Sequence, residues 1–135
     1  MNIIKIIYFP VLGDERGALI ALENNKNIPF NIKRVYYIYG TKPDVARGFH
    51  AHKNLKQVAI CISGYCRFVM DNGLSKDEVI LDTPSKGLFI DAMQWHEMHD
   101  FSADCILLVL ASDVYDESDY IRDYDSFLSE VKNEM

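Results

Sequence analysis

The sequence predicts an all-β fold of two packed sheets, a sandwich or jelly roll, followed by a short C-terminal helix. Seven short apolar runs recur between glycine, proline and Asp-Asn-Gly turn signals, a pattern typical of antiparallel strands rather than alternating strand and helix units. Only the end of the chain has apolar residues at helical spacing. A chain of 135 residues, 49% of them hydrophobic, suits one core, so we expect a single domain over 1–135.

The apolar runs define where the strands are expected. Lys5 interrupts the first run and Pro10 ends it, so this run is too short and too poorly flanked for a signal peptide or membrane helix. Asp-Asn-Gly at 71–73 predicts a hairpin turn, because Asn and Gly tolerate positive φ. The predicted strands lie at residues 3–9, 34–39, 56–63, 66–70, 78–82, 87–90 and 105–112.

The C-terminal segment predicts a helix that packs on one of the sheets. Its apolar residues are spaced at i, i+3, i+4 and i+7, at Tyr124, Phe127, Leu128 and Val131.

Charge and cysteine content exclude several classes of function. A net charge of −6 and a pI near 5.1 argue against nucleic-acid or anionic-membrane binding. An anionic ligand such as a phosphate would need a few placed cations, and four lie near the motifs described below, Arg16, Arg34, Arg47 and Lys53. The cysteines are three in number and lie in apolar runs, at Cys61, Cys66 and Cys105. They predict core packing in a reducing, cytoplasmic setting, and no catalytic thiol.

All four histidines fall in two places, Gly-Phe-His-Ala-His-Lys at 48–53 and Trp-His-Glu-Met-His at 95–99. In an extended strand the side chains of His50 and His52 point to the same face, so both would line one cavity wall. Three interpretations are open: a polar network in the core, a metal site, or an acid/base pair.

The metal interpretation is disfavoured by one residue. The stretch 48–64 has the form of the first cupin motif, in which two histidines and a later glutamate hold a metal. Here Gln57 stands at the glutamate position, with Gly64 in place after it. Three histidines alone can hold zinc, but a neutral amide is a poor ligand. Without metal, two imidazoles with pKa values near neutrality suit proton transfer to and from carbon.

Other polar residues have weaker signals. Arg34 and Tyr36 share one face of a strand, so either Tyr36 or its neighbour Tyr37 should face the cavity. Arg16 lies in a tight turn, where a solvated charge is the plain interpretation. Trp95 fits either the core or a stacking platform, and we interpret Glu97 and His99 as structural.

Five segments together closely resemble the dTDP-4-dehydro-6-deoxyglucose 3,4-ketoisomerases, the WxcM-like cupins of deoxysugar biosynthesis. They cover nearly the whole chain, at residues 14–17, 28–40, 47–53, 95–102 and 107–128. The resemblance implies a homodimeric cupin jelly roll with exchanged N-terminal strands. It implies dTDP-4-keto-6-deoxyglucose as substrate, movement of the ketone from C4 to C3, and neither a metal nor a redox cofactor.

The resemblance also implies residue roles. His50 is the leading base, His52 its partner in proton delivery, Tyr36 a hydroxyl that holds or relays a proton, and Arg47 a cation for the enediolate or diphosphate. The residues alone do not decide which imidazole attacks C3. The further substrate-binding candidates are Arg16, Arg34, Gln57 and His96.

Two positions bear on the product. Galacto-forming members resemble this chain in Arg16 and His96, whereas gluco-forming members tend toward Tyr and Arg there, so we expect dTDP-3-keto-6-deoxygalactose. The alternatives are a gluco-forming ketoisomerase, a dTDP-sugar 3,5-epimerase, and a non-catalytic sugar-binding cupin. A sugar-binding cupin that acts as a sensor needs an output domain, and the single domain that we expect here counts against it.

Overall fold

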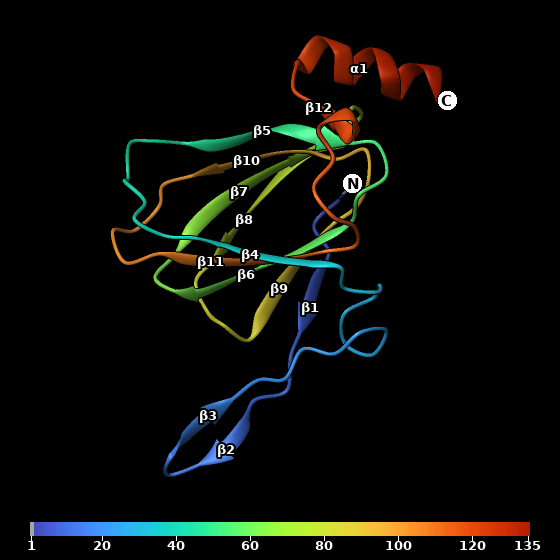
Figure 1. Ribbon diagram of the computed structural model, residues 1–135. Coiled ribbons are helices and arrows are strands. Elements are labelled where there is room, and N and C mark those ends of the chain that lie inside the picture. The colour runs from blue at the N-terminus through green and yellow to red at the C-terminus, as the bar shows by residue number, and fades with distance from the viewer. Residues whose placement is uncertain (1) are drawn as a thin grey trace.

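The computed structural model describes residues 2–135 as two antiparallel five-stranded sheets packed face to face (Figure 1). The first sheet has the order β1 (Ile6–Tyr8), β9 (Lys86–Ile90), β6 (Gln57–Ser63), β11 (Ile106–Ala111) and β4 (Arg34–Ile38). The second has the order β12 (Tyr120–Ile121), β5 (Arg47–His52), β10 (Trp95–His99), β7 (Cys66–Asp71) and β8 (Lys76–Leu81). The predicted all-β jelly roll is confirmed.

The predicted strands match the observed ones within a few residues, except that the first, expected at 3–9, is a strand only over Ile6–Tyr8. The Asp-Asn-Gly prediction is also confirmed, since Asn72 closes the turn between β7 and β8 and Gly73 has a φ of 90°. Two strands that carry histidines, β5 and β10, were not among the apolar runs, because polar side chains interrupt them.

The core between the sheets is apolar and includes all three cysteines. Phe68, Leu88 and Leu107 are among its fully buried members. Cys61 and Cys105 bring their sulfur atoms to 3.6 Å, and both are free thiols, as is Cys66. The predicted packing role of the cysteines is confirmed.

Helix α1 (Tyr124–Asn133) covers one end of the second sheet (Figure 1). It begins after Asp123, whose carboxylate accepts a hydrogen bond from the Ser126 N–H, the usual N-cap arrangement. Its buried Phe127 packs against Trp95, so Trp95 is a core residue on the outer face of β10. No helix among residues 2–135 is long and apolar enough to cross a membrane.

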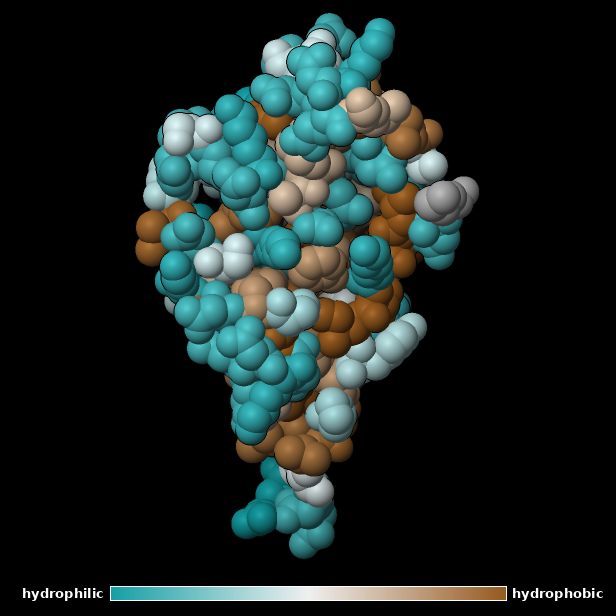
Figure 2. All heavy atoms as spheres, turned by 90° about the vertical axis from the view of Figure 1, so that its right-hand side faces the viewer, coloured by the Kyte–Doolittle hydropathy of each residue, from teal (hydrophilic) through white to brown (hydrophobic). Residues whose placement is uncertain are grey.

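A hairpin of β2 (Leu12–Asp14) and β3 (Gly17–Leu19) projects from the sandwich (Figure 1). Its apolar side chains Val11, Leu12 and Leu19 are each more than half exposed. Figure 2 shows hydrophobic side chains gathered where the hairpin leaves the body, below which its tip is hydrophilic. A two-stranded hairpin on its own is marginally stable in water, and a single chain leaves the apolar side chains of this one uncovered.

Candidate active site

The site is built around a bulge in β5. His96 pairs with His50, but the next residue of β10, Glu97, pairs with Gly48, so Phe49 is the extra residue and has a φ of 62°. Gly48 has a φ of 91°, and a Cβ there would lie 2.9 Å from the carbonyl oxygen of His96. Bulges re-aim side chains near functional sites, and this one directs His50 into the sandwich.

Three imidazoles meet in the interior, and we call His50, His52 and His96 the histidine cluster. The ring centroid of His50 lies 4.6 Å from that of His96 and 5.0 Å from that of His52. The expectation that His50 and His52 share one face is confirmed, and the structure adds His96 from the neighbouring strand.

Backbone carbonyls fix the tautomer of two members. His50 Nδ1 lies 3.1 Å from the Gly48 oxygen, and His96 Nδ1 lies 3.2 Å from the Gln94 oxygen. Because a carbonyl only accepts, each Nδ1 must carry the hydrogen and donate it. In the neutral rings Nε2 is therefore free to accept a proton.

Burial keeps these imidazoles neutral. It lowers the pKa of His96 to about 3 and that of His52 to about 4, in both cases reinforced by the neighbouring His50. Burial also lowers the pKa of His50. Burial therefore leaves the imidazoles unprotonated, which is the state that a general base needs. The pKa values of His52 and His96 lie below the near-neutral range expected from the sequence, because burial disfavours the charged ring.

Tyr36 faces the interior and its neighbour Tyr37 is exposed, which decides between the two tyrosines. Burial raises the pKa of Tyr36, so its hydroxyl stays protonated. That oxygen accepts a hydrogen bond of 2.8 Å from the amide nitrogen of the buried Gln57. Gln57 was predicted as a substrate-binding residue, but the structure places its amide on Tyr36 and outside the wall of the main cavity described next.

The main cavity, of about 500 Å³, opens beside His50 and Tyr36, a size within the range of small-molecule sites. Three arginines line it, Arg34, Arg47 and Arg122. Arg34 and Arg47 have no carboxylate partner within ion-pair distance among residues 2–135. Unpaired guanidinium groups beside a cavity suit a phosphate or an oxyanion.

The segment before α1 supplies a wall that the sequence analysis did not identify. Tyr120 on β12 lies 4.3 Å from the His52 ring and 4.9 Å from the His50 ring, measured between centroids. Arg122 stacks over Tyr120 at 4.1 Å and pairs with Glu117. This stretch belongs to the segment 107–128 that carries the family resemblance, but its density of tyrosines and acidic residues does not show what they face.

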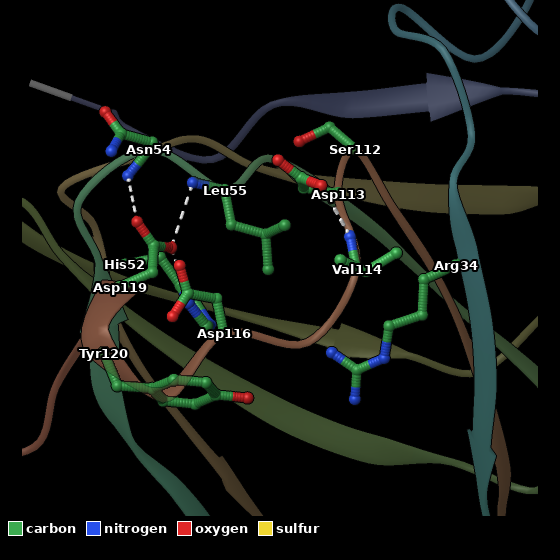
Figure 3. Close-up of a pocket in the computed structure, with 10 residues that line it drawn as sticks. All are labelled: Arg34, His52, Asn54, Leu55, Ser112, Asp113, Val114, Asp116, Asp119 and Tyr120. Carbon is green, nitrogen blue, oxygen red and sulfur yellow. Dashed lines mark hydrogen bonds and ion pairs between the residues drawn. The ribbon is translucent and has the colours of Figure 1, made fainter.

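A second, smaller cavity of about 160 Å³ lies behind Tyr120 (Figure 3). Asp119 and His52 both line it, and Asp119 Oδ2 lies 3.2 Å from His52 Nδ1. This contact joins residues that are far apart in the sequence.

Arg16 and His99 both lie away from the histidine cluster. Arg16 lies at the tip of the β2–β3 hairpin, with an 87% exposed side chain paired to Asp14, so one chain alone does not bring it to the histidine cluster. His99 pairs with Glu97 through its Nε2, at 2.9 Å, and the two residues form a polar pair outside the cluster, in line with the structural role expected for them.

A metal is the alternative ligand for the cluster. The ring nitrogens of its three members lie within 4.8 Å of one another. At the position of the glutamate that metal-binding cupins use, however, Gln57 directs its amide to Tyr36. Three histidines alone can hold zinc, but the neutral amide that replaces the carboxylate is a poor metal ligand, so metal independence stays a prediction.

The family model described as FdtA, WxcM-like, C-terminal, matches residues 2–132. The chain belongs to the WxcM-like FdtA family. A curated relative from Aneurinibacillus thermoaerophilus, named TDP-4-oxo-6-deoxy-alpha-D-glucose-3,4-oxoisomerase, is 58% identical over 123 residues, which are 91% of this chain and 88% of the relative.

Solved structures of three 3,4-ketoisomerases are closely similar to this chain in fold. A 3,4-ketoisomerase from Helicobacter canadensis is 55% identical with a TM-score of 0.93, covering 96% of this chain and 98% of its own. WlaRB from Campylobacter jejuni, a TDP-quinovose 3,4-ketoisomerase, is 50% identical with a TM-score of 0.91, covering 96% and 99%. A histidine-to-asparagine mutant of the 3,4-ketoisomerase QdtA from Thermoanaerobacterium thermosaccharolyticum, solved with TDP-4-keto-6-deoxyglucose, is 43% identical with a TM-score of 0.93, covering 96% and 94%.

Proposed function

We propose that this WxcM-like protein is an isomerase that converts dTDP-4-keto-6-deoxyglucose to the 3-keto sugar. The observation that carries the proposal is the histidine cluster beside the main cavity, in a chain 58% identical to a named TDP-sugar 3,4-oxoisomerase. The reaction is a tautomerisation: a base removes the C3 proton, an enediol or enediolate forms, and a proton returns at C4. No electrons leave or enter, so no redox cofactor is needed.

We assign the base to His50, which lines the main cavity, whereas His52 and His96 do not. Its Nδ1 donates to the Gly48 carbonyl, which leaves Nε2 to accept the C3 proton. His52 stands next to it, 5.0 Å away between ring centroids, as the partner in proton delivery. A group within reach of the proton and in the correct protonation state is what general-base catalysis requires.

Charge on the enediolate oxygen needs a donor or a cation. The protonated hydroxyl of Tyr36, held by Gln57, lines the same cavity as His50. Arg34 and Arg47 line it too and suit the diphosphate or the enediolate. His96, buried behind His50, would shape the pocket around C4 rather than enter the main cavity.

We propose a galacto product, dTDP-3-keto-6-deoxygalactose, on the basis of Arg16 and His96. Overall identity does not choose between products, because WlaRB, named for the gluco sugar quinovose, is 50% identical, and WlaRA, named for the galacto sugar fucose, is 39% identical. A QdtA double mutant solved with TDP has a tyrosine changed to arginine and an arginine changed to histidine. The two changes introduce an arginine and a histidine, the residue types that this chain has at Arg16 and His96.

The projecting hairpin supports a homodimer that exchanges N-terminal strands. Its exposed apolar residues Val11, Leu12 and Leu19 need cover. An apolar groove on the first sheet, lined in part by Ile60, Ile62 and Leu108, lies beside β3 and continues that surface. In such a dimer Arg16 would leave its own subunit, which gives it a route to the partner's cavity. Size-exclusion chromatography followed by light scattering should then give a mass twice the 15.5 kDa of one chain.

One experiment tests the reaction. The purified protein is incubated with dTDP-4-keto-6-deoxyglucose in deuterium oxide, and C3 and C4 are followed by NMR. The proposal expects loss of the C3 proton, a ketone at C3 and hydrogen or deuterium at C4. A 3,5-epimerase would exchange C3 and C5 and leave the ketone at C4, and a non-catalytic binder would produce no exchange above the buffer rate.

The epimerase alternative has little support. A dTDP-4-dehydrorhamnose 3,5-epimerase from Bacillus anthracis has a TM-score of 0.76 but is only 16% identical, which indicates a shared fold and nothing about activity. We further propose a single cupin domain over residues 1–135 and a cytoplasmic location, the latter supported by three cysteines that are free thiols.

A further inference from the structure

His52 is an unusual buried histidine. Its side chain is 2% exposed, and neither ring nitrogen has a hydrogen-bond partner with good geometry among residues 2–135. Buried polar atoms nearly always have such a partner, and one without it is costly unless it has a task. The imidazole is therefore arranged for an interaction that the substrate-free protein leaves incomplete.

Asp119 is the carboxylate closest to completing that arrangement. Its Oδ2 lies 3.2 Å from His52 Nδ1, a distance at which a small rotation of the ring makes a directed hydrogen bond. Hydrogen bonds of catalytic groups often tighten only when the substrate is bound. Nδ1 thus faces the carboxylate, and Nε2 is the nitrogen left for proton transfer.

Asp119 is itself held in place. Its Oδ1 accepts the backbone N–H of Asn54 at 2.8 Å, and its Oδ2 accepts that of Leu55 at 3.2 Å (Figure 3). The Asp119 carbonyl also accepts the N–H of Lys53. The carboxylate is therefore fixed against the loop that leaves β5 just after His52, so its position relative to the ring is well defined.

We propose that Asp119 is a positioning residue that orients His52 and keeps its hydrogen on Nδ1. A carboxylate that accepts from Nδ1–H fixes the tautomer, leaves Nε2 as the acceptor, and stabilises the imidazolium that forms when Nε2 takes a proton. The role in turnover rests on the proposed ketoisomerase function; the tautomer does not depend on it.

The wild-type protein gives the first test. Long-range ¹H–¹⁵N spectra of the substrate-free protein at pH 7, assigned with His52→Asn, report which nitrogen of each histidine carries the hydrogen. The expected result for His52 is hydrogen on Nδ1. Hydrogen on Nε2 would overturn the proposal, whether or not the protein is an isomerase.

Asp119→Asn gives the second test. The amide must present its NH₂ either to a backbone N–H or to His52, so the three contacts cannot all be kept. We expect kcat to fall at least about 10-fold with KM within about twofold, because the ring is misplaced for the chemical step only. The matched control is Asp113→Asn, which removes a carboxylate from the same small cavity without touching His52, and it should retain wild-type kcat.

Chemical rescue separates positioning from a merely structural role. In Asp119→Ala the small cavity gains room for formate, and added sodium formate should restore kcat several-fold, while sodium chloride at equal ionic strength should not. His52→Asn should gain nothing from formate. A folded Asp119→Asn with wild-type kcat, or equal recovery in chloride and formate, would refute the role. Absence of turnover in the wild type would instead refute the proposed function.

Discussion

Gly48→Ala tests whether the bulge in β5 holds the histidine cluster together. The new Cβ would lie 2.9 Å from the His96 carbonyl oxygen and 3.3 Å from Glu97 Cα, both on the neighbouring strand β10. These are backbone atoms, so the strands must separate by several tenths of an ångström. Because the Gly48 carbonyl also accepts from His50 Nδ1, the shift moves the imidazole that we assign as the base.

The loss of stability has two parts. A positive φ costs a residue with a side chain about 1–2 kcal/mol, and Gly48 has a φ of 91°. Forcing extra atoms into a packed contact costs about 1–3 kcal/mol more. The free energy of unfolding should therefore fall by about 2–5 kcal/mol, and kcat should fall by at least about 10-fold in the fraction that stays folded.

Gly40→Ala is the matched control. Its φ is 66°, but a Cβ there meets no atom within 4 Å, so it carries the backbone cost alone. Urea unfolding followed by fluorescence of the single tryptophan, Trp95, measures both variants. A Gly48→Ala protein as stable and as active as Gly40→Ala would refute the close approach of β5 to β10.

Four further predictions follow from the site. His50→Asn and His52→Asn should each reduce turnover by at least about 10²-fold, the usual scale for a positioned acid or base, while His99→Asn, which removes a histidine outside the cluster, stays active; near-wild-type rates for both cluster variants would make the cluster structural. Prolonged dialysis against EDTA should leave activity intact, and activity that is lost and then restored by one added metal would contradict the acid/base mechanism. Because burial lowers the folded-state pKa of His96 to about 3 and of His52 to about 4 from an ordinary 6.5, the unfolded chain binds protons that the folded chain does not. Their stabilising contribution is complete above pH 6.5 and is lost as the pH falls toward 4, by up to about 1.4 kcal/mol per pH unit for each histidine; urea unfolding at several pH values should show this slope, and His96→Asn should reduce it. Borohydride reduction of the product and measurement of the C4 coupling constants should give a galacto sugar for the wild type and some gluco sugar for the pair Arg16→Tyr and His96→Arg, whereas a gluco wild type would contradict the assignment.

Local patterns in the sequence determined much of the fold. The apolar runs predicted all five strands of the first sheet and two of the five in the second, Asp-Asn-Gly predicted the hairpin at Gly73, and the spacing of Tyr124 and Phe127 predicted the helix. These signals lie within a few residues of one another along the chain. Backbone geometry is set at that range, so the sequence alone was sufficient.

Part of the candidate site was also predictable from local sequence. The alternation of side chains along a strand put His50 and His52 on one face and allowed either Tyr36 or Tyr37 to point inward. The same rule could not say which face is the interior. Only the packing of the two sheets decided that Tyr36 is inside.

The remaining site residues depend on contacts between distant segments. The pairing of β5 with β10 brings His96 to His50, and the return of the chain through β12 brings Asp119 to His52. Likewise Gln57, which its motif placed at a ligand position, donates a hydrogen bond to Tyr36 on another strand. The projecting hairpin holds Arg16 away from the histidine cluster of the same chain. Such contacts depend on strand order and register, which are set by the burial of the whole core and not by any short stretch of sequence.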